Sequence, residues 1–354
     1  MTTTIPACLV CALLSAGEPE YHLQVTPARR VEAWLTCRID APALSAREWI
    51  IFAAKPPKLP GQTEIRAELL PSGRSSLELS SQRRPILWAR LPVRSSNRQS
   101  GLTIRAKYRA TLLARRLIAG EPTPAASRAP PLTPREQRNA TSQTPLIDTD
   151  SPALVRWLDE HQLRRREDEG AISFARRTYL FVKQNFSYVY EPEMDRSASH
   201  VCAAGKSDCA GLSALFAAVL RAGRVPARLL VGRMVKSDPH WRVPQEVRRS
   251  GKHVRAEFFV AEVGWVPVDI ATAVGDRLPG SLAHFGNDPG DMLVLHVNDK
   301  LILNTVHFGR KPVESLQGVS YWVLSKGTPE DVKLHEGWQV RNLPLEPADE
   351  ENGD

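Results

Sequence analysis

The chain is poor in cysteine. Five cysteines occur in 354 residues, at positions 8, 11, 37, 202 and 209. An odd and small number in a chain of this length excludes the disulfide framework of small secreted domains. Cys8 and Cys11 form a CxxC pair, but no second Cys or His pair follows nearby. The pair therefore lacks the spacing of a zinc site.

Long hydrophobic runs are also missing. The apolar run at residues 5–16 is too short to span a bilayer, and no other stretch is apolar enough for a transmembrane helix. No Lys or Arg precedes the run, although small residues suitable for cleavage follow at 15–17. We interpret residues 1–19 as an N-terminal segment, either a weak signal peptide or a buried or disordered start. A cytoplasmic location is favoured, with export to the periplasm or cell envelope as the alternative.

Nucleic-acid motifs are absent as well. The sequence has no basic helix with interleaved aromatic residues, so we expect no nucleic-acid partner. Lys and Arg outnumber Asp and Glu by 47 to 39, a formal net charge of +8. This balance favours an anionic partner such as an acidic membrane face or a cell-wall polymer. A generally arginine-rich surface is the alternative.

Residues 20–118 have the alternation of half-buried strands. Small and apolar residues occupy every second position in 31–39, 65–69 and 102–108. A period of two means that one face of a strand is buried and the other is in water. Proline and glycine separate the runs at 55–57 and 71–73. Several such strands in succession predict an antiparallel β-sandwich, whose role we expect to be packing or binding.

The composition changes at residues 119–151. Pro, Thr, Ser and Arg dominate there, and few large apolar residues occur. Such a segment cannot bury enough surface to fold alone, so we predict an interdomain linker. Residues 152–330 are predicted to form the second domain, and residues 331–354 a C-terminal tail.

The second domain combines helical and strand patterns. Apolar residues from Ile172 to Phe186 recur as on a half-buried helix. A second helix should begin near Cys209 and end at Gly223. Strands are predicted at 227–235, 253–260, 265–270, 292–297 and 319–324.

Cys209 is a candidate nucleophile. Ser207 is a suitable N-cap, which would place Cys209 in the first turn of its helix. Unpaired N–H groups and the helix dipole favour negative charge there, so we expect a depressed thiol pKa. Cys202, seven residues earlier, is either a small buried residue or a redox partner of Cys209.

His253 and Asp269 are candidate partners of this thiol. His253 begins an alternating strand and shares a face with Arg255 and Glu257. Asp269 ends the next strand, where an acidic residue is unfavourable without a partner. A simple hairpin does not place the two opposite each other, so a bulge or stagger is expected. Cys, His and Asp at the ends of separate elements, in this order, can build a thiolate–imidazolium–carboxylate site.

Four motifs in this order resemble the core of the transglutaminase-like superfamily, in a bacterial-type member. They are Ser207-Asp208-Cys209 and residues 220–228, 253–257 and 264–269, within a match over residues 172–275. The resemblance implies an α+β fold, with a papain-like core domain preceded by the β-sandwich. It also implies Cys209 as nucleophile, His253 as general acid and base, and Asp269 as the group that orients the imidazole. The mechanism requires no metal and no organic cofactor.

Further residues acquire interpretations from this resemblance. Tyr188 is a candidate oxyanion donor, with a packed aromatic as the alternative. Arg255 stands where the family has an aromatic site wall, so it either changes substrate preference or is solvated. Arg228 belongs to the fold, and Glu257 is a suitable partner for it behind the site. The acids that follow lack EF-hand spacing and are interpreted as turn residues: Asp276, Asp288 and Asp291.

Together these features predict a cysteine-dependent enzyme. Cys209 would attack an amide carbonyl of a peptide or protein substrate and form a thioester, which water or an amine would release. The expected activity is that of a transglutaminase-like cysteine peptidase, amidase or acyltransferase. Hydrolysis is favoured because nothing in the sequence identifies an amine-acceptor site. The alternative is a non-catalytic binding or scaffold protein with the same fold.

Overall fold

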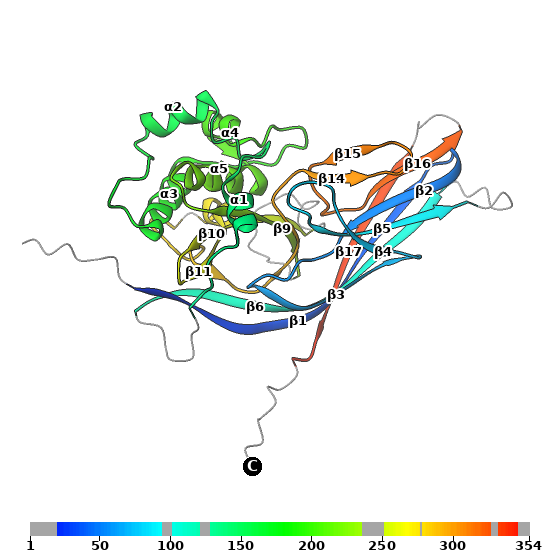
Figure 1. Ribbon diagram of the computed structural model, residues 1–354, viewed down its shortest axis with the longest axis horizontal. Helices are drawn as coiled ribbons and strands as arrows, with labels where there is room; N and C mark the ends of the chain where they lie inside the picture. Colours follow the sequence, from blue (N-terminus) through cyan, green and yellow to red (C-terminus); the bar gives the residue numbers. More distant parts are fainter. Residues whose placement is uncertain are drawn as a thin grey trace, which may run out of the picture.

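The computed structural model describes residues 20–93, 101–120, 128–235, 251–276, 278–326 and 332–345. The interpretation of residues 1–19, with Cys8 and Cys11, lies outside these ranges. The fold is α+β, as predicted. Figure 1 shows the helices gathered at one end of the molecule and long antiparallel strands at the other. No helix in the described ranges has the length and apolar character needed to cross a membrane.

Two antiparallel sheets form the predicted β-sandwich. One has the order β12-β6-β1-β17, with β3 also paired to β6, and the other has the order β16-β2-β5-β4. Their strands are β1 (Tyr21–Asp40), β2 (Ser45–Ala54), β3 (Gln62–Leu70), β4 (Arg74–Leu77), β5 (Pro85–Pro92), β6 (Gly101–Ala119), β12 (Asn287–Asp288), β16 (Ser320–Lys326) and β17 (Lys333–Leu343).

The core of the sandwich follows the period of two that the sequence shows. Cys37 and Ile39 of β1 are fully buried, and Arg38 between them is exposed. In β6, Ile104 and Ala106 are buried in the same way. Alternate side chains on a strand point to opposite faces, so one face of each strand supplies the core.

The C-terminal residues differ from the tail expected at 331–354. Strand β17 pairs antiparallel with β1 along its whole length, from Arg30↔Leu343 to Asp40↔Lys333. Strand β16, from the region expected to belong to the second domain, pairs with β2. The last part of the chain therefore completes the sandwich. The alternation of residues within a strand could not predict this pairing, because it depends on which edge strands of the sheets still have unpaired backbone groups.

The segment expected as a linker, residues 119–151, contains a helix. Helix α1 (Pro134–Thr141) begins with a capping box in which Thr133 and Glu136 satisfy each other's backbone N–H groups. Ala140 on this helix is buried. The Thr-Pro-Arg-Glu sequence was a readable start signal that the composition of the whole segment obscured.

The second part of the fold packs helices against an antiparallel sheet of order β11-β10-β9-β13. Its helices are α2 (Pro152–Glu160), α3 (Ala171–Asn185), α4 (Ala198–Ala204), α5 (Cys209–Ala222) and α7 (Ile270–Gly275), and its strands are β9 (Ala227–Met234), β10 (Lys252–Val260), β11 (Gly264–Val268) and β13 (Met292–Val297). Two smaller sheets pair β7 (Ser187–Tyr188) with β8 (Lys206–Ser207), and β14 (Leu301–Asn304) with β15 (Arg310–Val313).

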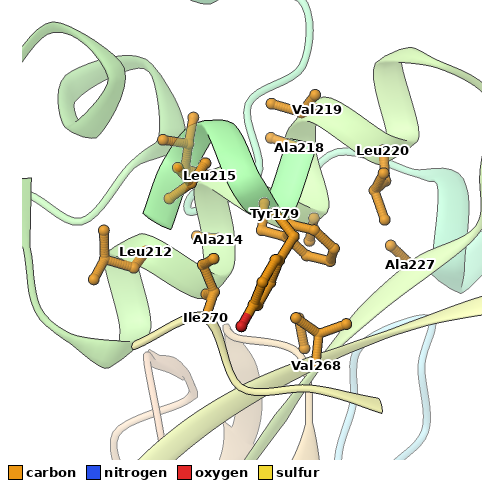
Figure 2. Close-up of a cluster of buried hydrophobic side chains, with 14 of the residues drawn as sticks. Tyr179, Leu212, Ala214, Leu215, Ala218, Val219, Leu220, Ala227, Val268 and Ile270 are labelled. Carbon is orange, nitrogen blue, oxygen red and sulfur yellow. The ribbon is translucent and has the colours of Figure 1, made fainter. Parts of the chain in front are cut away.

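Helix α5 lies at the centre of this second core. Figure 2 shows its apolar side chains, including Leu212 and Leu215, in one cluster with Tyr179. The helix ends at Gly223, as predicted, but with a φ of −82° rather than a left-handed one. Glycine is required there because a side chain would collide with the ring of Phe174.

The sandwich and the helical part of the fold are in direct contact. Strand β12 pairs with β6 of the sandwich. Leu293 and Leu295 of β13 are buried in the sandwich core, not in the core around α5. In Figure 1, β1 and β6 extend from the sandwich past β10 and β11, and Leu117 of β6 packs against the α5 core. The sandwich therefore supports the sheet on which the candidate site is built.

Candidate active site

Cys209 is the first residue of α5 and follows an N-cap carboxylate. Asp208, rather than Ser207, is the N-cap. Its Oδ1 accepts hydrogen bonds from the N–H groups of Ala210 at 3.0 Å and Gly211 at 3.3 Å. Ser207 lies in β8 and occupies the space that a side chain at Gly211 would need. The thiol therefore sits at the very start of the helix.

The surroundings of the Cys209 thiol favour its protonated form. Cys209 is 8% exposed. Burial raises the pKa of the thiol, and the charge of Asp208 raises it further, while a hydrogen bond from the backbone of Val254 acts in the opposite direction. The expected depressed pKa is therefore wrong here, because desolvation outweighs the helix N-terminus. A base is needed to ionise this thiol at neutral pH.

His253 and Asp269 are in direct contact. Nε2 of His253 lies 2.8 Å from Oδ2 of Asp269, and both side chains are buried. The β10–β11 ladder extends only to Ala256↔Val268, so Asp269 lies just beyond the end of β11. His253 and Asp269 therefore meet beyond the last paired residues of the two strands, and no bulge in the ladder is involved. Asp269 is also the N-cap of α7, because Oδ1 accepts the N–H of Thr272 at 3.0 Å.

Asp269 is held as a carboxylate. Burial by itself would raise its pKa. The charge of His253 when its imidazole is protonated, the charge of Arg255, and the hydrogen bonds from His253 and Thr272 outweigh burial and hold the pKa of Asp269 well below its usual range. At neutral pH the group is therefore an anion that can orient an imidazole.

The three predicted catalytic residues come from elements that meet at one place. Cys209 begins α5, His253 is near the start of β10, and Asp269 follows β11. The thiol of Cys209 lies against the backbone of Val254, the residue after His253. Ser213, one turn along α5, donates from Oγ to the carbonyl of Val254 at 3.1 Å and fixes the helix to the strand.

Arg255 lies behind Asp269 and not in the wall of the cavity beside Cys209. Its guanidinium contacts three carboxylates: Nε lies 2.8 Å from Asp269, Nη1 lies 3.2 Å from Asp288, and Nη2 lies 2.8 Å from Asp291. Burial would lower the pKa of Arg255, but these charges raise it. This placement differs from the site wall expected from the sequence. Asp288 and Asp291, interpreted as turn residues, are in fact its ion-pair partners.

Sequence reasoning missed Arg115 of β6. Its side chain is 1% exposed and donates to Glu257 at 2.9 Å and to Asp288 at 3.0 Å. Because Asp288 also binds Arg255, a chain of charged groups links the sandwich to the candidate site. A signal was present in the sequence: Arg115 and Arg116 are neighbours on a strand, so alternation must turn one of them inward.

The predicted pairing of Arg228 with Glu257 is confirmed. The two residues are opposite each other in the β9–β10 ladder, and Nε of Arg228 donates to Glu257 at 2.6 Å. The guanidinium also lies 3.8 Å from the centre of the Trp265 ring, which adds a cation–π contact. These contacts fix the spacing of β9, β10 and β11 behind the site.

Tyr188 lies beside Cys209. Its buried hydroxyl has no hydrogen-bond partner within the part of the chain that the structure describes. Burial raises the pKa of Tyr188, and the charges of the neighbouring Cys209 and Asp208 raise it further, while the nearby backbone N–H of Cys209, which does not reach hydrogen-bond geometry, lowers it. The hydroxyl is therefore a protonated donor. The ring also packs against the α5 core, as the alternative interpretation expects.

A cavity of about 710 Å³ opens next to Cys209. Val254 of β10 and Leu229 and Val231 of β9 line it, together with residues 188, 190 and 192–196 before α4 and residues 314, 315 and 317 after β15. Ligand sites commonly have volumes of roughly 300–1,000 Å³, so this cavity could hold a short stretch of peptide.

The structure does not join Cys202 to Cys209. Both are free thiols. Sγ of Cys202 in α4 contacts the carbonyl of Ser199 at 3.2 Å, and burial raises the pKa of Cys202 to about 11. Over the ranges that the structure covers, no group of three or more His, Cys, Asp or Glu side chains is arranged to hold a metal ion.

Comparison of the sequence with known families finds one match. Residues 160–270 match the transglutaminase-like superfamily. These residues include all three of the predicted catalytic side chains. No curated protein matches the sequence.

Comparison of the structure with solved structures finds related folds. A Cytophaga hutchinsonii protein described as a candidate cysteine protease is similar with a TM-score of 0.53 and 12% sequence identity, covering 92% of this chain and 94% of that one. At this identity the similarity is one of fold. The periplasmic domain of TgpA from Pseudomonas aeruginosa has a TM-score of 0.35 and 15% identity, covering 71% of this chain and 92% of that one.

Proposed function

We propose that the protein is a cysteine-dependent enzyme, because residues 160–270 match the transglutaminase-like superfamily. Cys209, His253 and Asp269 are its catalytic triad, and it hydrolyses or transfers acyl groups at amide bonds of a peptide or protein. The observation that carries this proposal is the 2.8 Å contact between His253 and the carboxylate of Asp269, beside a cysteine at a helix N-terminus.

In the proposed reaction, His253 acts as a general base. Its Nε2 faces Asp269, so the thiol proton passes to Nδ1 as sulfur bonds to the substrate carbonyl carbon. The imidazolium then protonates the leaving amine, the C–N bond breaks, and a thioester remains on Cys209. Water, activated by the neutral imidazole, attacks the thioester and returns the thiol with the carboxylic acid product. An amine in place of water would give acyl transfer.

Negative charge develops on the substrate carbonyl oxygen during the attack, and hydrogen-bond donors must stabilise it. The backbone N–H of Cys209 and the hydroxyl of Tyr188 are the proposed pair. The Tyr188 hydroxyl is suited to this role because it is buried, protonated and unpartnered among the described residues, and because Tyr188 lines the same cavity as Cys209.

Labelling of Cys209 tests the triad. Intact-mass spectrometry would follow iodoacetamide and p-nitrophenyl acetate at pH 7 in the wild type and in the Cys209→Ala, His253→Ala and Cys202→Ala variants. In a Cys8→Ser/Cys11→Ser background, which removes the two thiols outside the described residues, we expect one label in the parent protein and in Cys202→Ala, and none in Cys209→Ala. Loss of the base should slow labelling in His253→Ala by about a hundredfold.

The two reagents also separate the role of Tyr188. Acylation by the ester forms an oxyanion, whereas alkylation by iodoacetamide does not. Tyr188→Phe should therefore slow acylation by about a hundredfold, the usual cost of losing one oxyanion donor, and leave alkylation unchanged. Equal effects on both reactions would mean that Tyr188 only packs against the core.

A non-catalytic scaffold is the second candidate. One observation favours it: burial and the raised pKa of Cys209 are properties that a structural thiol shares. Slow labelling at Cys209 that is indifferent to His253 would establish the scaffold and exclude the enzyme.

A further inference from the structure

The cavity beside Cys209 carries an excess of negative charge, although the whole chain carries a net charge of +8. Five carboxylates and two cations line it. The carboxylates belong to Glu193, Asp195, Asp208, Asp299 and Glu314, and the cations to Arg196 and Lys252.

Both cations are engaged by carboxylates. Nε of Arg196 donates to Asp208 at 2.7 Å, and the same guanidinium donates to backbone carbonyls of the loop before α4. Nζ of Lys252 lies 3.3 Å from Glu336, which is outside the cavity lining. Among the described residues, Asp208 is the one cavity carboxylate in an ion pair, and the other four form none.

The remaining carboxylates have few partners. Asp195 accepts the N–H of Ser197, the N-cap residue of α4, at 2.8 Å. The side chains of Glu193 and Glu314 are exposed and form no ion pair with any residue in the described ranges. Glu193 lines the cavity from the loop before α4, and Glu314 lines it from the segment after β15.

Asp299 is the buried member of the group, with 4% exposure. Its Oδ2 accepts the N–H of Leu146 at 3.2 Å, but its Oδ1 has no hydrogen-bond partner among the described residues. Arg221 and Arg84 interact with Asp299 through space, but neither donates to its carboxylate. Arg221 donates to Asn298 and to the carbonyls of Ala227, Ser142 and Asn139, and Arg84 donates to the backbone carbonyl of Asp299. A buried carboxylate oxygen without a donor is unfavourable, so a donor entering the cavity would satisfy it.

We propose that this cavity binds a cationic side chain of the acyl donor, of the lysine or arginine type. The inference rests on the proposed function and adds a substrate class to it. An ammonium or guanidinium group on a bound peptide would interact with Glu193, Glu314 and Asp299 while its carbonyl lies at Cys209. A cleft lined by charges of one sign also concentrates ligands of the opposite sign.

Peptide electrophiles test this preference. Acyloxymethyl ketones of Ala-Xaa and Xaa-Ala, with Xaa as lysine, norleucine or glutamate, would be compared by their second-order rates of Cys209 labelling. We expect the better lysine probe to react about tenfold faster than its glutamate counterpart, with norleucine between them. The difference should shrink as ionic strength rises, because salt screens exposed charges.

Matched variants assign the effect to the cavity. The double variant Glu193→Gln/Glu314→Gln should reduce the lysine-to-glutamate ratio to about threefold or less, since two exposed charges are removed without loss of packing. Asp299→Asn retains an acceptor for Leu146 and should reduce the ratio as well. Glu160→Gln, an exposed carboxylate on α2 outside the cavity lining, should leave the ratio unchanged.

The outcomes separate the two proposals. Equal rates for the lysine and glutamate probes, with labelling that still depends on His253, would overturn the substrate class and leave the enzyme standing. If the probes react equally but butylamine speeds release of an acetyl group from Cys209, the carboxylates serve an acceptor amine and the donor proposal is overturned. Labelling indifferent to His253 would overturn both proposals.

Discussion

The pKa of the Cys209 thiol determines the pH at which the sulfur can react as a thiolate. Burial and Asp208 raise the pKa of the thiol, so ionisation without help requires alkaline pH. Below the pKa, the thiolate fraction falls tenfold for each pH unit. In the proposed mechanism, His253 removes this limit by accepting the proton during attack.

The His253→Ala variant should therefore show a different pH profile. We expect its alkylation rate to remain low through neutral pH and to rise only above the range of an ordinary thiol, near pH 8.5. The wild type should already react near pH 7. Iodoacetamide rates measured by intact mass between pH 6 and 10 test this, with urea-unfolded protein as the reference thiol. Superimposed wild-type and variant profiles would contradict a role for His253 as base.

The N-cap of helix α5, Asp208, also affects the ionisation of Cys209. Asp208 caps the helix and pairs with Arg196, but its charge also opposes ionisation of Cys209. Asparagine is as good an N-cap as aspartate, whereas alanine is not. The two substitutions therefore separate the cap from the charge.

Asp208→Asn should keep the cap and lower the pKa of Cys209, so that alkylation in the His253→Ala background becomes faster at a given pH. Asp208→Ala should have the same effect on reactivity, and its free energy of unfolding should fall by about 1 kcal/mol more than that of the asparagine variant. Urea denaturation and labelling rates measure the two effects. Slower labelling in both variants would mean that Asp208 assists ionisation.

The two parts of the molecule are joined by buried charges. Arg115 of the sandwich binds Glu257 and Asp288, and Asp288 binds Arg255 next to Asp269. Removing one member of a buried ion pair costs about 3–5 kcal/mol, because its partners stay buried and charged. The retained contacts of Glu257 with Arg228 and of Asp288 with Arg255 should keep the cost near the lower value.

Arg115→Met should therefore lower the free energy of unfolding by about 3 kcal/mol. Arg116→Met is the matched control, because Arg116 is the exposed neighbour on the same strand, and it should change stability by less than about 0.5 kcal/mol. Urea denaturation measures both changes in stability, from the shift of the unfolding midpoint at an unchanged m-value. Equal stability of the two variants would show that the sandwich does not hold the second domain through this ion chain.

Local patterns in the sequence determined the elements. The period of two in residues 31–39 and 102–108 predicted strands that are present in β1 and β6. The helical pattern of 172–186 predicted α3. These predictions hold because a strand or an amphipathic helix buries one face whatever its neighbours are. The order of Cys209, His253 and Asp269 was readable for the same reason, since each lies at the end of such an element.

Only the tertiary structure decided what surrounds these elements. That β17 joins β1, that Arg115 turns inward toward Glu257, and that Arg255 lies behind Asp269 all depend on contacts between residues far apart in the chain. The raised pKa of Cys209 is decided in the same way, because desolvation depends on what covers the thiol and not on its position in a helix. Periodicity specifies which face of an element is buried, whereas the partner of a buried charge is set by the packing of the whole molecule.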